Sequence, residues 1–246
     1  MALILQSHAA GPPRWIQQCT ASVRDWAAQQ GHEYRCCDDA LFDLLPADLR
    51  ARTRLQPAIA SDLARLLWLR QELERGAQCV VWLDADSLIF APQDFVLRES
   101  SYALGREVWI QAQGQGWRCY RKVHNAFLQF RPGNPLLAFY IHAAERILRE
   151  HRAGAMAPQL IGPKLLSALQ ALGGGPVQES AVALSPPVIQ DLLNGGGPAL
   201  ELYRARSMGA AACANLCASS VQRGELGEVQ MLALIKALQA QPQALA

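Results

Sequence analysis

The sequence predicts an α/β fold in which one sheet is flanked by helices. The first observation is the order of its elements: strand-like apolar stretches alternate with helical patterns, in the order 2–8, 13–30, 33–37, 57–74 and 77–90. Strand, helix and strand in succession are typical of parallel strands with helices packed on them. The second observation is size, because 246 residues, 51% of them hydrophobic, suffice for one sizeable core. We therefore expect a single domain over 1–246.

Local signals bound the first two helices. In the helical pattern over 13–30, Trp15, Cys19 and Val23 fall on one stripe, and Gly31 ends it. The second helix begins at Pro57, a residue well placed in a first turn, and is closed by Gly76. The polar segment 45–56 between them is expected to be a short helix or a loop.

Beyond residue 94 the alternation is looser. Strands are expected at 102–114 and 124–133, joined by a basic loop, GQGWRCYRK, that contains glycine. The remaining expectations are helices at 135–150, 157–171 and 226–240, a strand after the glycine break within 172–187, and a mobile loop at 194–198.

Charge and cysteine content restrict the class of protein. The 23 basic and 21 acidic residues leave a formal charge of +2, which gives no reason to expect nucleic acid as a partner. Seven cysteines without zinc-like spacing indicate reduced, buried thiols and a cytoplasmic protein. Cys213 and Cys217, four apart, would share a face if they lay on a helix. The first residues contain no basic leader and no apolar run reaches about 18 residues, so we expect neither a signal peptide nor a transmembrane segment.

Two aspartates follow an apolar run in VVWLDAD, residues 80–86. Residues two apart in a strand point to the same side, so Asp84 and Asp86 would both reach a site at the carboxyl end of the strand, where α/β sheets bind ligands. Three interpretations are open: a strand that ends in solvated turn residues, a haloacid-dehalogenase-type phosphatase with an aspartate nucleophile, and a sugar transferase that uses a divalent cation.

The phosphatase interpretation requires more aspartates later in the chain, because they hold magnesium beside the nucleophile. After Asp94 the only aspartate is Asp191, in a stretch that has the pattern of an amphipathic helix. The motif also follows more than eighty residues instead of lying in the first strand. These facts favour the transferase.

Four segments in order carry a resemblance to a known family: IASDLARLLWL (59–69), VVWLDAD (80–86), HNAFLQFRPGNPLL (124–137) and IGPKLLSAL (161–169). Together with the opening unit over 12–42, they resemble the small bacterial Asp-x-Asp glycosyltransferases of GT-A fold. These enzymes are similar to glycosyltransferase family 32 and to the clostridial toxin glucosyltransferases. The resemblance covers most of 1–170 and implies a GT-A-like, Rossmann-type mixed sheet flanked by helices.

The resemblance also implies roles for individual residues. Asp86 would bind Mn²⁺ or Mg²⁺, and Asp84 would contact ribose or sugar hydroxyls and reach the metal through water. Asp62 and Arg65 match a Ser-Asp-x-x-Arg pattern that holds the donor sugar; the alternative is an exposed i,i+3 ion pair worth a few tenths of a kcal/mol. Asn125 would touch the sugar, or be a turn residue at a strand edge.

The same resemblance extends to a turn and to the chain ends. Gly162 and Pro163 match a turn beside the acceptor, or simply start a helix. Gln6 and His8, at the end of the first strand, would face the nucleotide base. The family often has a histidine metal ligand near its C-terminus, but no histidine follows His151. Asn215 would stand in for that histidine, and Ser219 for the serine that follows it. The amide oxygen of Asn215 could bind a metal but would contribute no charge.

The basic loop offers a further candidate site. Trp109 and Trp117 flank it, and Arg118, Arg121 and Lys122 follow. Aromatic rings beside cations suit an acceptor sugar or a phosphate-bearing acceptor. A solvated loop over a partly buried tryptophan explains the same residues.

These expectations describe a metal-assisted glycosyltransferase of polysaccharide biosynthesis. Its donor would be a nucleotide-diphosphate sugar of the uridine type, a UDP-sugar, and its acceptor a saccharide, a lipid-linked saccharide or a protein. The resemblance implies retention of anomeric configuration, and no nucleophile is assigned. The alternative is a non-catalytic nucleotide- or saccharide-binding module of the same fold, which the absent histidine keeps open.

Overall fold

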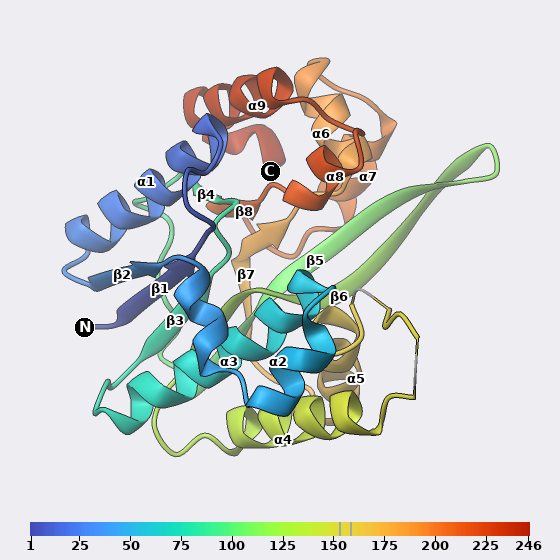
Figure 1. Ribbon diagram of the computed structural model, residues 1–246. Coiled ribbons are helices and arrows are strands. Elements are labelled where there is room, and N and C mark those ends of the chain that lie inside the picture. Colours follow the sequence, from blue (N-terminus) through green and yellow to red (C-terminus); the bar gives the residue numbers. More distant parts are fainter. Residues whose placement is uncertain (153, 158) are drawn as a thin grey trace.

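A computed structural model describes residues 1–152, 154–157 and 159–246 and places a mixed eight-stranded sheet between two layers of helices (Figure 1). The strands are β1 Leu3–Ser7, β2 Glu33–Cys37, β3 Val80–Leu83, β4 Ser87–Ile89, β5 Tyr102–Gln113, β6 Gly116–Phe130, β7 Val177–Ala183 and β8 Cys213–Asn215. Their order is β2-β1-β3-β6-β5-β7-β8-β4. The predicted α/β class, with a mixed sheet flanked by helices, is confirmed.

The α-helices are α1 Arg14–Gln29, α2 Ala47–Thr53, α3 Pro57–Glu74, α4 Pro135–Glu150, α5 Pro163–Gly173, α6 Pro186–Leu193, α7 Pro198–Arg206, α8 Ala218–Gln222 and α9 Glu228–Ala240. Short 3₁₀ turns lie at Asp39–Leu44 and Pro242–Leu245. The bounds predicted for α3 and α4 are confirmed to the residue. Proline begins both helices, and the Asn134 side chain caps α4 by accepting a hydrogen bond from the Leu136 amide.

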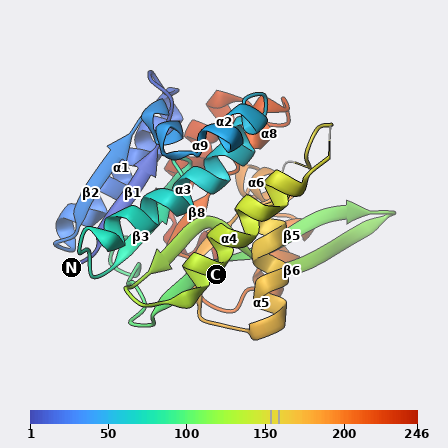
Figure 2. The same cartoon turned by 60° about the horizontal axis from the view of Figure 1, so that its bottom comes forward.

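Both faces of the sheet are buried, so its central strand is apolar on both sides. Val80 and Trp82 of β3 pack in a core with α2, α3, α4 and α5, and Figure 2 shows α3 and α4 lying over that face. Val81 and Leu83 point into the opposite core, which α1, α6, α7 and α9 cover.

The sheet curls strongly between β3 and β4. Only three residues, Asp84 to Asp86, separate these strands, yet β3 lies within the sheet and β4 at its far edge beside β8. Three residues span at most about 14 Å between the flanking positions. The sheet must therefore bend until β8 and β4 come close to the carboxyl end of β3, with the two aspartates inside the bend.

The structure corrects several predicted elements. The single strand expected at 77–90 is two strands, and Asp84 and Asp86 lie in the turn between them instead of on one strand. The expected basic loop is part of β6, because β5 and β6 pair up to Gln113 and Gly116. The helix predicted over 157–171 begins at Pro163, and Pro158 lies outside the described residues. Helix α7 was not predicted, because glycines at 195–197 suggested only a loop there.

The cysteines are free, as expected, but they are not uniformly buried. Cys36 is exposed, and Cys37, Cys119 and Cys217 are half-buried. Cys213 and Cys217 do not share a helix face: one lies in β8, and the other precedes α8. In the described part of the chain, no helix is long and apolar enough to cross a membrane.

Candidate functional site

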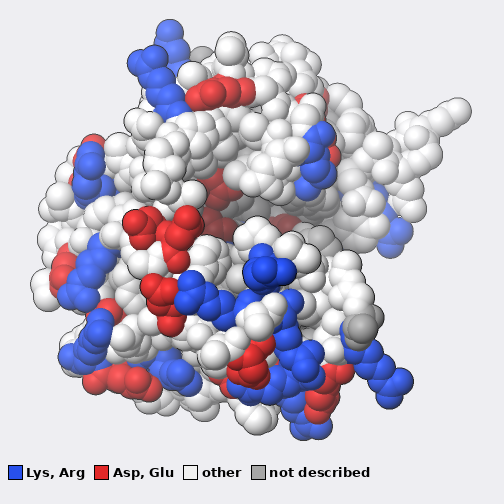
Figure 3. All heavy atoms as spheres, viewed as in Figure 1, with Lys and Arg blue, Asp and Glu red and all other residues white. Residues whose placement is uncertain are grey.

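A cavity of about 510 Å³ opens where the carboxyl ends of β1 and β3 meet α3, β6, β8 and α8. Figure 3 shows a hollow in this face of the molecule with acidic atoms in its depth. Polar side chains that line the cavity include Ser61, Asp62, Arg65, Asp84, Asp86, Asn125, Asn215, Ser219 and Arg223. The carboxyl edge of the sheet is the expected place for a ligand in an α/β protein.

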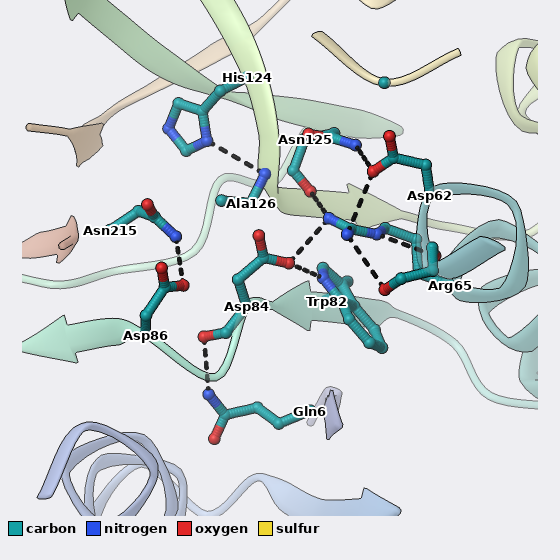
Figure 4. A network of polar contacts seen from close by, with 12 residues as sticks. Gln6, Asp62, Arg65, Trp82, Asp84, Asp86, His124, Asn125, Ala126 and Asn215 are labelled. Carbon is teal, nitrogen blue, oxygen red and sulfur yellow. Dashed lines mark hydrogen bonds and ion pairs between the residues drawn. The ribbon is translucent and has the colours of Figure 1, made fainter. Parts of the chain in front are cut away.

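Asp84 is held in a fixed orientation by three neighbours (Figure 4). One carboxylate oxygen, Oδ1, accepts hydrogen bonds from Trp82 Nε1 at 2.6 Å and from Arg65 Nη1 at 2.7 Å. The Gln6 amide donates to the Asp84 backbone carbonyl at 3.1 Å. Since both side-chain bonds go to Oδ1, the second oxygen, Oδ2, stays available to a ligand in the cavity.

Arg65 joins two carboxylates inside the protein. Its guanidinium lies 3.2 Å from Asp62 Oδ1 and 2.7 Å from Asp84 Oδ1, and it also donates to the Asn125 carbonyl at 3.0 Å. Asp62 and Arg65 are each only 6% exposed. The exposed-pair alternative is therefore wrong: the i,i+3 pair exists, but it is buried and is shared with Asp84.

Asn125 lines this side of the cavity, and Gly162 packs against Asp62 and Asn125. The Asn125 amide donates to Asp62 Oδ1 at 2.7 Å. Asn125 lies within β6, so the alternative of a turn residue at a strand edge is wrong. Gly162 precedes α5, and a Cβ there would collide with the Asp62 carboxylate and crowd the Asn125 amide. A glycine is needed at this position for space.

An irregularity in β6 presents the Asn125 segment to the cavity. The register between β5 and β6 shifts at Leu104 and Gly105. His124 supports this shift, because its Nδ1 accepts from the Ala126 amide at 3.1 Å and its Nε2 lies 3.2 Å from the Ala181 carbonyl. Burial lowers the pKa of His124 to about 4, so the ring is neutral at physiological pH. In this segment the Asn125 carbonyl accepts from Arg65, and the Ala126 carbonyl accepts from the Asp84 amide beyond the last β3–β6 pair.

Among the described residues, no cation forms an ion pair with Asp86, in contrast to Asp84. Its Oδ1 accepts from Asn215 Nδ2 at 2.6 Å, and its Oδ2 accepts from the Ala218 amide at 2.7 Å. The Asn215 oxygen accepts from the Cys217 amide at 3.0 Å. Cys217 adopts a left-handed conformation, with φ of 59°, and so turns the chain from β8 into α8 over this carboxylate.

Burial dominates the electrostatics of the carboxylates. It raises the pKa of Asp62 to about 6, against the opposing effects of Arg65 and Asn125. Burial, followed by repulsion from Asp84, raises the pKa of Asp86 to about 6. Both groups are thus mainly ionised at neutral pH, at a cost that a bound cation or hydrogen-bond donor would reduce.

The donor set around Asp86 fits a divalent cation. Carboxylate and amide oxygens are hard ligands, and each Asp86 oxygen keeps a second lone pair beyond its one hydrogen bond. The raised pKa of Asp86 reflects burial first and repulsion from Asp84 second, and a cation would offset both. Among the described residues no three His, Cys, Asp or Glu side chains gather in a metal-binding group. Asn215, water or a ligand phosphate would have to complete the coordination.

The two candidates at the end of β1 have different positions. Gln6 is fully buried, and its oxygen accepts from the Tyr34 hydroxyl at 3.0 Å, so it supports Asp84 from behind. His8 lines a second cavity of about 310 Å³, between the β1–α1 connection and α8. The two cavities share Ile16, Ala85, Ala218 and Gln222 and are thus neighbours.

Of the remaining residues singled out in the sequence, two line the main cavity and those of the basic segment do not. Pro163 and Ser219 line the main cavity. Trp109, Trp117, Arg118, Arg121 and Lys122 belong to the β5–β6 hairpin and are not among its lining residues.

Sequence reasoning missed Trp82 and Ser61. Trp82 is two residues before Asp84, and that spacing places both side chains on the same side of an extended chain. Ser61 precedes Arg65 by one helical turn, and its hydroxyl accepts from Arg65 Nη2 at 3.3 Å. Both relationships were visible as spacings in the sequence.

No model of a protein family matches the chain, and no curated protein matches its sequence. Among solved structures, it is similar to a glycosyltransferase involved in the glycosylation of the major capsid of PBCV-1. That pair has 11% identity and a TM-score of 0.48, over 91% of this chain and 97% of the other. A second is the galactosyltransferase LgtC in complex with donor and acceptor sugar analogues, with 14% identity, a TM-score of 0.44 and 96% of each chain covered. At these values function has to be argued from the site.

Proposed function

We propose that this protein is a glycosyltransferase of GT-A type that moves a sugar from a nucleotide-diphosphate donor, of the uridine class, to an acceptor. The observation that carries the proposal is the buried network of Asp62, Arg65, Asp84 and Asn125 along a cavity that also contains Asp86. Sugar hydroxyls both donate and accept, so they require fixed acceptors and donors side by side. This network supplies both.

Each part of the donor has a matching place. Asp62 and Asn125 would hold sugar hydroxyls, with Arg65 fixing the carboxylates from behind. Asp86, Asp84 and Asn215 would hold Mn²⁺ or Mg²⁺, which supplies Lewis-acid neutralisation of the diphosphate leaving group when bound. The neighbouring cavity beside His8 would take the nucleoside. Retention follows from the family resemblance, and no nucleophile is assigned.

The acceptor belongs on the side of the cavity formed by Gly162 and Pro163. The close packing of Gly162 on Asp62 puts the start of α5 directly beside the proposed sugar position. A saccharide, a lipid-linked saccharide and a protein side chain are all compatible with this opening.

One observation favours a second function, a non-catalytic nucleotide- or saccharide-binding module. The Asn215 amide nitrogen donates to Asp86 Oδ1 at 2.6 Å and its oxygen accepts from the Cys217 amide at 3.0 Å, so a neutral amide engaged on both sides stands where a histidine ligand is expected. Such a module would bind the donor but would not release nucleoside diphosphate from it.

The phosphatase interpretation receives no support from Asp191. Its Oδ2 accepts from the Ala199 and Leu200 amides at 2.8 and 3.0 Å and so caps α7. It does not line the cavity that contains Asp84.

The test separates the sugar from the nucleotide. Asp62→Asn keeps the shape of the side chain but removes the charge-assisted hydrogen bond, which contributes about 1.5–3 kcal/mol. Calorimetry should show a UDP-sugar binding roughly ten- to a hundredfold more weakly, because about 1.4 kcal/mol is tenfold, while UDP is unaffected. Asp94→Asn, at an exposed position outside the cavity, is the matched control.

The placing of the sugar would be contradicted if Asp62→Asn weakened the binding of UDP-sugar and of UDP equally, or if it weakened the binding of neither. Arg65→Lys is a suitable companion variant because it keeps the positive charge. Arg65→Ala would leave two carboxylates without their cation in the interior, at a cost to stability of about 3–5 kcal/mol.

A further inference from the structure

Strands β5 and β6 continue beyond the sheet as a projecting two-stranded ribbon, residues 108–123 (Figure 1). Its outer part, residues 111–118, is exposed on both strands. In the described chain, β5 pairs with β7 only as far as Glu107, and β6 pairs with β3 only from Phe127 onward. A two-stranded hairpin is marginally stable in water on its own. Contact with a partner would therefore stabilise the outer part of the ribbon.

The ribbon has an excess of positive charge. No aspartate or glutamate occurs between Val108 and Ala144, whereas β6 contains Arg118, Arg121 and Lys122. Glu107, at the base of the ribbon, is opposite Lys122 in the register. The Arg118 guanidinium carbon lies 4.8 Å and the Lys122 ammonium 5.2 Å from the centre of the Tyr120 ring. The ring thus holds two like charges close together, which an anionic partner would stabilise.

Apolar groups are exposed beside these cations. Trp117 is 39% exposed on the outer part of the ribbon, and Met208, after α7, is 62% exposed. Arg121 donates to the Met208 sulfur at 3.2 Å, which ties the ribbon to that segment. Arg206 lies near the same place, since it and Arg121 both act to lower the pKa of the Cys119 thiol, which burial raises. Alternate residues of a strand point to opposite faces, so Trp117 and Arg121, with Met208, lie on one face of the ribbon, and Arg118 and Lys122 lie on the other. The ribbon thus carries cations on both of its faces.

We propose that this ribbon docks the protein end-on on an anionic lipid bilayer, with its exposed outer end and Trp117 in the interfacial region and with Arg118, Arg121 and Lys122, from its two faces, against phosphate headgroups. Basic residues are attracted to anionic leaflets, and tryptophan favours the membrane–water interface. A second copy of the chain fits less well, because two ribbons side by side would bring like charges together. Docking does not depend on sugar transfer and can be measured without a donor.

The test uses the full chain and sedimentation with lipid vesicles. Vesicles of phosphatidylcholine with phosphatidylglycerol should bind the protein, and vesicles of phosphatidylcholine alone should bind it far less. Combined substitution of Arg118, Arg121 and Lys122 by Gln should reduce binding on the order of a hundredfold, and added salt should reduce wild-type binding. The matched control replaces exposed Arg52, Arg54 and Lys236 by Gln, with the same loss of charge.

Trp117 provides an independent readout. Vesicles that contain a lipid-borne quencher should reduce tryptophan fluorescence in the wild type, and Trp117→Phe should lose most of that quenching. Equal loss of binding in the two triple variants, or an absence of wild-type binding to anionic vesicles, would overturn the proposal. Binding to soluble polyphosphate without binding to vesicles would overturn it too, since the ribbon would then recognise a soluble polyanion.

Discussion

Asp84 and Asp86 are separated by a single alanine, yet their surroundings differ in charge. Asp84 lies against the Arg65 guanidinium and the Trp82 indole, and it is partly open to the cavity. Asp86 is buried and accepts only from the Asn215 amide and the Ala218 backbone. A cation that enters the cavity would therefore gain most from Asp86, which forms no direct ion pair with a described residue, whereas Asp84 pairs with Arg65.

This difference predicts a metal linkage at Asp86. UDP should bind more tightly to the wild type with manganese than with a chelator, because the cation would join the diphosphate to Asp86. Asp86→Asn should remove that difference and leave the fold intact, since the Asn215 and Ala218 contacts are on a short turn at the rim of the sheet. Calorimetry in both conditions measures the effect. Equal affinity with manganese and with chelator in the wild type would refute the linkage.

Burial of Asp62 predicts a pH dependence of stability. Its pKa is about 6 in the folded protein and 3.8 as the reference value, so the folded state binds the proton more tightly. The contribution of Asp62 to the free energy of unfolding is fully present below the unfolded pKa. It is lost as pH rises through the folded pKa of about 6, by up to about 3 kcal/mol.

Thermal unfolding without metal, followed from pH 7 down to pH 4, tests this sign. The wild type should gain stability on acidification over that range relative to Asp62→Asn, which lacks the titrating group. Asp94→Asn, at an exposed position, should behave as the wild type. A wild type that loses stability relative to Asp62→Asn on acidification would show that the pKa of Asp62 is not raised.

At the scale of elements, the start of α5 matters because Gly162, the residue before the helix, packs against Asp62 and Asn125. Gly162→Ala would press a methyl group onto the Asp62 carboxylate and the Asn125 amide. We expect weaker UDP-sugar binding and a loss of stability of about 1–3 kcal/mol from overpacking. Gly173→Ala, at the other end of the same helix and in open space, is the control and should change neither. Unchanged sugar binding in Gly162→Ala would place the sugar elsewhere in the cavity.

Elements with clear terminal signals could be predicted from the sequence, and others could not. Pro57 and Pro135 begin their helices where the sequence indicated. The apolar run at 77–90 gave no sign that it contains two strands from different parts of the sheet, because pairing partners are not encoded locally. Glycines 114 and 116 predict a loop around Trp117, yet only residues 114 and 115 form the turn, and Gly116 already pairs with Gln113.

At the scale of the whole molecule, the curl of the sheet creates the site. Residues from α3, β6 and the β3–β4 turn meet although they are far apart in sequence: Arg65 binds Asp84, and Asn125 binds Asp62. The family resemblance indicated these residues one by one. It did not indicate that Arg65 neutralises Asp84, because that contact depends on how α3 packs on β3.

The measurement that tests the central claim most directly is release of nucleoside diphosphate from a panel of UDP-sugars with manganese. The wild type should slowly release UDP from one member by hydrolysis and should not release phosphate from small phosphomonoesters. Asp86→Asn should reduce the rate about a hundredfold or more, since a Lewis acid contributes several kcal/mol to such a step. Tight binding of a UDP-sugar without UDP release, even with candidate saccharide acceptors added, would contradict the assignment as a transferase and identify a binding module instead.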